Sequence, residues 1–357
     1  MQKSIKINEI AEALVTEHGA RMTRSHKSVF RDFVVNIAED MGYDAKIENC
    51  FLSKNVVVGN PKTADIVLTA HYDTPPNLPF NFVKKQVVGL GLGVPSLIGA
   101  GLFVTDYALK NCDPETVGKV IDVVSHFDMI PVAATVGCVG LGLYSLGFAG
   151  GENKTNYDDN SSGVLTVISL MEYYKNLPPE EKQKIAFVFF DNEEKGLVGS
   201  LCYRAKHAKE TGVFKCVKNQ NFINFDCVGV GKRVNLIYPG KNNSEITSKF
   251  KESFDSKKSD DFSVKLQKSN INTMSDHCSF GKAKGSVTIL CDDEGDGVVN
   301  HIHSKKDTML NLRNIGEISR ISAETIDDLL GFDEKTKSKL NKEVFNLSGE
   351  LSAEKQK

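Results

Sequence analysis

The sequence predicts an α/β fold in which helices cover both faces of a central sheet. Segments with helical spacing of apolar residues alternate along the chain with short apolar runs that are typical of strands. Those runs are nearly continuous, which indicates strands buried on both faces rather than strands with one side in water. The 357 residues allow one large core with an insertion.

Apolar residues at helical spacing predict two N-terminal helices, over residues 5–18 and 27–41. A strand-like stretch follows over 51–58, and Asn60-Pro61 marks a turn. The remaining expected elements are buried strands at 65–70, 184–190, 221–225 and 286–290, and helices at about 161–176, 196–211, 244–255 and 317–330. Residues 333–357 are rich in Lys and Glu, which predicts a charged C-terminal tail or a short helix, loosely attached in either case.

Charge and cysteine content narrow the class of protein. The formal net charge is -2 and both signs are mixed along the chain, which argues against a nucleic-acid partner. The eight cysteines include no CxxC pair, and the first residues lack the apolar stretch of a secretory signal. We therefore expect a reduced, cytoplasmic compartment.

Five short segments of acidic residues and histidines are spread through the chain. Most of them follow an apolar run or open a helix, so their side chains are expected at the carboxyl edge of the sheet. The segments are His71-Tyr72-Asp73-Thr74, Asp158–Gly163, Asp191–Glu194, Asn224-Phe225-Asp226 and His301–Thr308. Carboxylates and imidazoles gathered there form a ligand set for two adjacent divalent metals, which predicts a hydrolase.

Two metals that share one site need a bridging carboxylate, because one imidazole cannot clamp both ions. Asp159 suits that role at a helix start; Asp158 is its closest rival. His71 with Asp226 can serve one metal, and Glu194 with His303 the other.

Two further acidic residues have supporting roles in this hypothesis. Glu193 and its neighbour Glu194 point in different directions, so one can bind a metal while the other reaches a water as general base. Asp73 lies two residues after His71 and could accept the remaining N–H of that imidazole, which would fix the orientation of the ring.

In this order, the motifs resemble metallopeptidase family 28, the co-catalytic dizinc aminopeptidases of the leucyl aminopeptidase and glutamate carboxypeptidase type. The family pattern is HxD, DNxSG, EExGLxGS, a strand-end NxD, SDHxxF and H[ST]xxDT. The matching segments are His71–Asp73, Asp159–Gly163, Glu193–Ser200, Asn224–Asp226, Ser275–Phe280 and His303–Thr308. Six motifs in the correct order are a specific signal, and the resemblance runs through residues 60–75 and 155–310.

The resemblance implies a three-layer sandwich of the zinc exopeptidase type, with a central, mostly parallel mixed sheet. It implies two zinc ions, or other divalent metals, with ligands and supporting residues as follows: metal ligands His71, Asp159, Glu194, Asp226 and His303; general base Glu193; support Asp73. Glu193 would act on a metal-bridging water in an aminopeptidase with a peptide substrate. A carboxypeptidase, an N-acyl amidohydrolase or a non-catalytic binding domain on the same scaffold are the alternatives.

Two histidines in these motifs have competing interpretations. His301 and His303 face the same side of an extended segment, and the HSxxDT match favours His303 as the ligand. His277, in the SDHxxF motif, either contacts the substrate or packs inside the protein.

Residues 80–150 depart from the family pattern, whose link between the first two motifs is much shorter. Val87–Leu109 carries one charged residue near its end, and Met129–Ala149 carries none. Each stretch is about 20 residues, long enough to cross a bilayer core as a helix. In that case the Lys84-Lys85 pair predicts a cytoplasmic catalytic domain that is anchored to the membrane through residues 87–149.

A buried helical hairpin, forming a lid or a dimer contact, is the other interpretation. Pro95, Pro131 and many glycines weaken both helices, and small residues also suit close helix pairing. The predicted organisation is a catalytic domain over 1–79 and 151–332, with an inserted apolar, Gly-rich helical hairpin over 80–150. The insertion leaves soon after Asp73 and returns shortly before Asp159, so both of its ends are expected beside the metal site.

Overall fold

The fold centres on a mixed, mostly parallel eight-stranded sheet. The computed structural model describes residues 6–50, 53–77, 151–209, 219–240, 245–260, 262–270, 273–293, 299 and 301–353. The strands of the sheet, in spatial order, are β1 (Ala45–Cys50), β2 (Ser53–Val58), β6 (Ile185–Phe190), β3 (Ile66–His71), β7 (Asn221–Phe225), β10 (Gly285–Asp292), β8 (Arg233–Tyr238) and β9 (Ser263–Lys268). The central neighbours β6, β3, β7 and β10 run parallel to one another, as the apolar runs predict.

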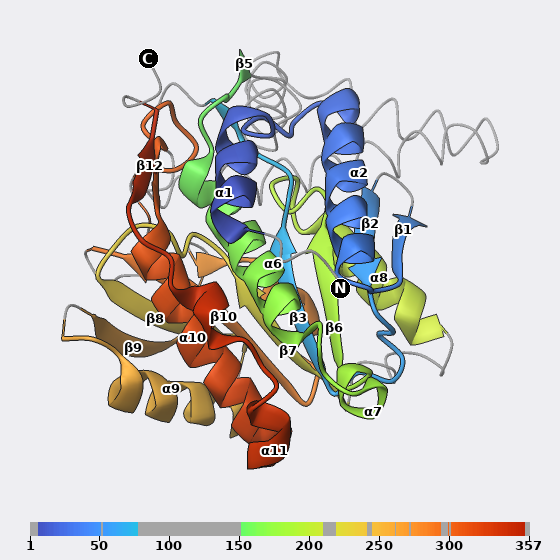
Figure 1. The fold of residues 1–357 in the computed structure, drawn as a ribbon. Helices are drawn as coiled ribbons and strands as arrows, with labels where there is room; N and C mark the ends of the chain where they lie inside the picture. The colour runs from blue at the N-terminus through green and yellow to red at the C-terminus, as the bar shows by residue number, and fades with distance from the viewer. Residues whose placement is uncertain are drawn as a thin grey trace, which may run out of the picture.

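Helices lie on both faces of this sheet, which confirms the predicted layered α/β architecture (Figure 1). The helices are α1 (Ile7–Thr16), α2 (Arg24–Asp40), α6 (Gly163–Tyr174), α7 (Pro179–Lys182), α8 (Val198–Lys209), α9 (Glu245–Lys257), α10 (Leu312–Leu329) and α11 (Glu334–Lys337). Shorter helical turns are η2 (Tyr157–Ser162), η4 (Asp276–Phe280) and η5 (Lys342–Phe345). The long helices fall close to the predicted ranges.

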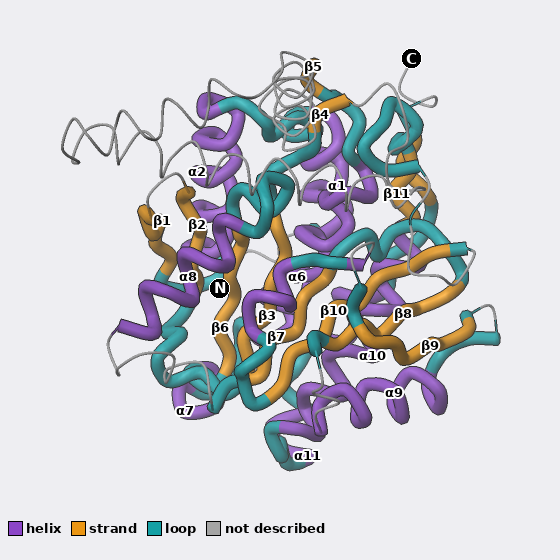
Figure 2. Tube along the Cα trace, turned by 180° about the vertical axis from the view of Figure 1, so that it is seen from behind, coloured by secondary structure: helices purple, strands orange, loops and turns teal. Residues whose placement is uncertain are grey.

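The two larger apolar clusters of the described residues lie on opposite faces of the sheet. The larger joins α1, α2, α6, α9 and α10 to one face of the sheet, around side chains such as Phe30, Leu165 and Ile318. The smaller joins α8 and η4 to the other face, where Phe222 and Phe280 stack with ring centroids 3.8 Å apart. Figure 2, seen from behind, shows α8 on this second face.

The C-terminal segment differs from its prediction, because it is not a loose tail as far as residue 353. Leu340, Val344 and Phe345 are buried in the larger core. The strand β12 (Glu350–Ser352) pairs with β11 (Met309–Asn311) next to the start of α10. Three apolar side chains in a charged segment are enough to dock it.

The insertion lies outside the described residues, so both interpretations of the 80–150 hairpin stay predictions. Among the residues described, no helix is long and apolar enough to span a membrane. The residues that flank the insertion are paired with each other: β4 (Pro76–Asn77) runs antiparallel to β5 (Gly151–Glu152). Asn153, just after β5, donates a hydrogen bond of 3.0 Å to the carbonyl of Ser304, next to His303. At least the returning end of the insertion therefore reaches the loop of the predicted ligand.

Candidate metal centre

Three neighbouring parallel strands deliver the predicted ligands to one edge of the sheet. β3 ends at His71, β6 ends just before the Asp191–Glu194 turn, and β7 ends just before Asp226. The η2–α6 segment brings Asp159 to the same place. A Cβ on Gly163 would lie 2.2 Å from the carbonyl oxygen of Phe225, so only glycine lets this helix start pack against the end of β7.

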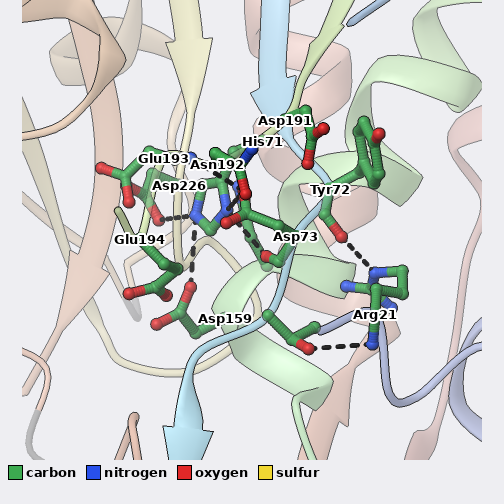
Figure 3. A network of polar contacts seen from close by, with 12 residues as sticks. Arg21, His71, Tyr72, Asp73, Asp159, Asp191, Asn192, Glu193, Glu194 and Asp226 are labelled. Carbon is green, nitrogen blue, oxygen red and sulfur yellow. Dashed lines mark hydrogen bonds and ion pairs between the residues drawn. The ribbon is translucent and has the colours of Figure 1, made fainter. Parts of the chain in front are cut away.

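The side chains form two donor groups that share Asp159. Figure 3 shows the first of them, in which His71 lies between Asp159 and Asp226. In the first, His71 Nε2 lies 3.2 Å from Asp159 Oδ1 and 3.5 Å from Asp226 Oδ1. In the second, His303 Nε2 lies 3.0 Å from Asp159 Oδ2 and 3.3 Å from Glu194 Oε2. All five predicted ligands therefore converge, and each oxygen of Asp159 faces a different histidine.

The two rivals considered from the sequence pair with each other instead. His301 Nε2 lies 3.0 Å from Asp158 Oδ2, while Asp158 Oδ1 accepts the backbone N–H of Gly229 at 2.7 Å. Asp307 accepts the backbone N–H groups of Asp158 and Asp159, at 2.7 and 3.0 Å, and so fixes the backbone beneath Asp159. This geometry favours Asp159 and His303 as the ligands.

Asp73 supports the centre by a different contact from the one expected. His71 Nδ1 bonds to the backbone carbonyl of Asp73 at 3.0 Å, whereas the Asp73 carboxylate lies 3.7 Å away. The carboxylate instead accepts the backbone N–H of Glu193 at 2.9 Å. The backbone turns after β3. As a result, the backbone carbonyl of Asp73 accepts the hydrogen bond from the imidazole of His71, and the Asp73 carboxylate accepts the one from the Glu193 N–H.

The charge balance of the site fits divalent cations. Among the residues that the structure describes, the buried Glu194 Oε1 accepts no hydrogen bond, and Asp159 Oδ1 has only the ion-pair contact with His71. Burial raises the pKa of Glu194 to about 7, although His303 opposes that rise. Burial also raises the pKa of Glu193 well above its usual value, aided by Glu194 and opposed by His71. Carboxylates and imidazoles are donors that bind zinc, and a cation bound among these buried carboxylates would favour their ionised form.

Both histidines are in turn shaped by the carboxylates around them. Burial disfavours their charged form, but the neighbouring carboxylates outweigh it and raise the pKa of His71 and of His303 well above the usual value. Burial alone would raise the pKa of Asp159, yet these two histidines hold it well below its usual range. The two histidines therefore favour the ionised form of Asp159, the form that binds a metal.

The SDHxxF motif supplies support beside the centre. Ser275 donates a hydrogen bond of 2.6 Å to Asp226 Oδ2. Asp276 is fully buried, and burial raises its pKa to about 7. His277 is also fully buried, with Nδ1 2.7 Å from Thr288 Oγ1, and burial lowers its pKa to about 3. This neutral, enclosed ring favours the packing interpretation of His277 over contact with the substrate.

Two buried cations near the site were missed from the sequence. Arg21 is fully buried and lies beside the His71–Asp73 segment (Figure 3), where it bonds to the Tyr72 carbonyl at 2.5 Å and to Ser161 Oγ at 3.1 Å. Lys27 binds Asp191 and Asn192. Helical spacing did place Lys27 on the apolar face of its helix, which was the available signal.

Sequence comparison identifies a family. The pattern of peptidase family M28 matches residues 109–326, more than half of the chain. The matched range contains Asp159, Glu193, Glu194, Asp226 and His303, whereas His71 lies before it. No curated protein sequence matches the chain.

Solved structures share the fold at low sequence identity. The LapA aminopeptidase of Legionella pneumophila is 15% identical, with a TM-score of 0.58 over 92% of this chain and 72% of that one. The glutaminyl cyclase of Porphyromonas gingivalis is 14% identical, with a TM-score of 0.56 over 92% and 98%. A Zn-dependent exopeptidase from Parabacteroides distasonis is 14% identical, with a TM-score of 0.55 over 93% and 100%. At these identities the likeness establishes the fold alone.

Proposed function

The chain belongs to peptidase family M28, a family of zinc peptidases, and we propose that it acts as an aminopeptidase that removes N-terminal residues from peptides. The observation that carries this proposal is the sharing of Asp159 by two donor groups, with Glu193 beside them. That arrangement suits two metal ions and a separate general base.

One zinc ion would be held by His71 and Asp226 and a second by Glu194 and His303, with Asp159 within reach of both groups. The buried oxygens Asp159 Oδ1 and Glu194 Oε1, which accept no well-formed hydrogen bond from the described residues, support this assignment. Bound zinc would supply a lowered pKa for a water molecule and polarisation of the scissile carbonyl.

Glu193 moves the proton in the proposed reaction. Its backbone is held by Asp73, and its side chain belongs to one donor group with His71 and Glu194. Glu193 takes a proton from the attacking water while the water oxygen bonds to the carbonyl carbon. It returns that proton to the amide nitrogen as the C–N bond breaks, so the carboxylate ends as it began.

The electrostatics of the site favour a free N-terminal amine over a C-terminal carboxylate. Buried or half-buried acidic side chains surround the donor groups, including Glu193 and Asp276. The buried cations Arg21, Lys27 and Arg31 bond to protein groups: Arg21 to backbone carbonyls and a hydroxyl, Lys27 to Asp191 and Asn192, and Arg31 to the Tyr72 hydroxyl. A cationic ammonium group suits such a surface, whereas a carboxylate would be repelled.

The test is hydrolysis of aminoacyl anilides, with free and with blocked amines, by purified zinc-loaded protein. We expect cleavage of the free-amine substrates alone. Replacing Glu193 by Gln should lower kcat by about 10²–10⁴-fold and leave the zinc content unchanged. Glu180, exposed on α7, provides the matched control, and E180Q should keep wild-type turnover.

Each other outcome identifies a different function. Cleavage of blocked substrates would mean an N-acyl amidohydrolase, and release of C-terminal residues a carboxypeptidase. Ammonia release from a peptide with N-terminal Gln, without peptide-bond cleavage, would point to cyclisation. Undiminished turnover in E193Q would refute the base assignment, and silence on every substrate with zinc bound would favour a binding domain.

A further inference from the structure

A buried lysine stands behind the turn that carries Glu193 and Glu194. Lys27 lies in the first turn of α2, and its side chain is 6% exposed. Its ammonium group donates to Asp191 Oδ1 and to Asn192 Oδ1, both at 2.6 Å. Helix α2 is thereby tied to the two residues that precede Glu193.

Asp191 is also fixed by strand β2. Its second carboxylate oxygen accepts the backbone N–H of Lys54 at 2.9 Å, and its own N–H donates to Asn55 Oδ1 at 3.0 Å. Its carbonyl accepts the hydroxyl of Ser53 at 3.1 Å. Asp191 therefore keeps three anchors without Lys27, and the bond to Asn192 is the one through which Lys27 reaches the turn.

The turn that follows has a conformation that its surroundings must hold. Asn192 and Leu197 have φ angles of 57° and 61°, in the left-handed region that residues other than glycine rarely adopt. Backbone bonds close the turn, from Val198 N–H to the Asn192 carbonyl and from Leu197 N–H to the Glu193 carbonyl. Asp73 holds the Glu193 N–H on one side, and Lys27 holds the Asn192 side chain on the other.

We propose that Lys27 is a positioning residue that fixes the turn from Asn192 to Leu197, so that Glu193 and Glu194 point into the metal centre. The inference rests on the proposed function, since Lys27 acts only through those two carboxylates. It extends the catalytic machinery to α2, which lies before the residues that match the family.

The test compares K27M with K175M. Lys175 at the end of α6 lies 2.6 Å from Glu172 Oε1, in a pair buried like that of Lys27. Both variants lose a buried ion pair, but only K27M loses a contact with the turn. We expect K27M to lower kcat by about 10–100-fold, with KM changed by less than about twofold. K175M should keep both constants, and K27R should recover part of the loss.

Hydrogen exchange gives a second measurement that does not depend on turnover. In K27M the amides of Glu193, Leu197 and Val198 should exchange faster, while K175M should leave them at the wild-type rate. The double variant K27M/D191N removes the carboxylate that K27M leaves buried and unpaired. It should regain thermal stability, yet keep the fast exchange and the low kcat.

Two results would overturn the proposal. One is wild-type exchange of these amides in K27M. The other is a double variant that regains kcat together with stability, because Lys27 would then only offset the charge of Asp191. A wild-type protein without turnover would refute the proposed function, while the exchange measurement would still decide whether Lys27 holds the turn.

Discussion

Asp159 is the residue on which the two-metal proposal depends. Its two oxygens lie 3.2 and 3.0 Å from different histidines, and Asp307 fixes its backbone from below. The carboxylate of Asp158, directly before it, bonds to His301 and to the backbone N–H of Gly229. Two adjacent aspartates thus have separable roles, and substitution can distinguish them.

Zinc should stabilise the wild-type protein and chelation should reverse the effect. At a free zinc concentration of about 100 times Kd, the free energy of unfolding should rise by about 3 kcal/mol, because zinc binds the folded state. D159N should lose most of this gain, since both donor groups lose their shared ligand. Urea denaturation with zinc and with EDTA measures the difference.

D158N is the control for that experiment. It should be less stable than the wild type, because Asp158 bonds to His301 and Gly229, yet it should keep the full response to zinc. A normal zinc response in D159N together with a lost response in D158N would reverse the ligand assignment.

Side chains that follow buried strands were predictable, whereas supporting contacts were not. His71 and Asp226 come directly at or after strands that the apolar runs reveal, so their meeting follows from the parallel sheet. Arg21 and Lys27 are charged residues of the kind that is usually solvated. Helical spacing places Lys27 on the apolar face of its helix, but no comparable signal predicts the burial of Arg21. The Asp73 carbonyl, rather than its carboxylate, bonds to His71, because the backbone turns after β3. A sequence motif does not specify such a turn.

At the scale of elements, α6 and α10 are joined by a buried polar contact. Asp327 of α10 is 2% exposed and accepts the hydroxyls of Tyr173 and Tyr174, at 2.8 and 3.1 Å. Burial raises the pKa of Asp327 to about 6, although the two tyrosine hydroxyls oppose that rise. The folded protein therefore binds this proton more tightly than the unfolded chain, where the pKa is about 3.9.

This difference predicts how stability changes with pH. The stabilisation is complete below about pH 4 and is lost as the pH rises through about 6, a fall of about 3 kcal/mol. D327N cannot ionise, so it should lack this part of the fall. Urea denaturation between pH 4 and 7.5 would measure both proteins. D328N, at the exposed neighbour, should follow the wild type, and an unchanged slope in D327N would contradict the assignment.

Central strands were predictable, and edge strands were not. The strands β3, β6, β7 and β10 are buried along most or all of their length, so continuous apolar runs reveal them. The sheet edges β1 and β9 expose many of their side chains and carry no such run. β8 is mostly buried, but Asn235 interrupts its short apolar run and hid it.

At the scale of the whole molecule, the pairing of β4 with β5 joins the ends of the insertion. Asn77 faces Gly151, and Pro76 faces Glu152, which also contacts His26 of α2 at 2.7 Å. The described part of the catalytic domain is therefore continuous across the β4–β5 pair, without the inserted residues 78–150. We propose that residues 87–149 anchor this domain to a membrane, as the length and near absence of charge of the stretches Val87–Leu109 and Met129–Ala149 suggest.

Replacing residues 79–149 by a short Gly-Ser linker tests both statements. We expect a folded, zinc-binding protein that still cleaves small anilides, because facing residues of an antiparallel pair lie only about 5 Å apart. On cell fractionation, the full chain should sediment with membranes after a carbonate wash, and the shortened chain should not. A full chain found in the soluble fraction would rule out the anchor, and a shortened chain that fails to fold would show that the insertion completes the core.

The closed β4–β5 ribbon has an evolutionary consequence. A segment that enters and leaves through neighbouring residues can grow, shrink or be exchanged without shifting the register of any strand in the catalytic sheet, and loop length itself adds little free energy. Selection can therefore act on the insertion and on the catalytic residues independently. One peptidase domain could in this way acquire a new cellular location or a new binding partner when a single inserted segment is replaced.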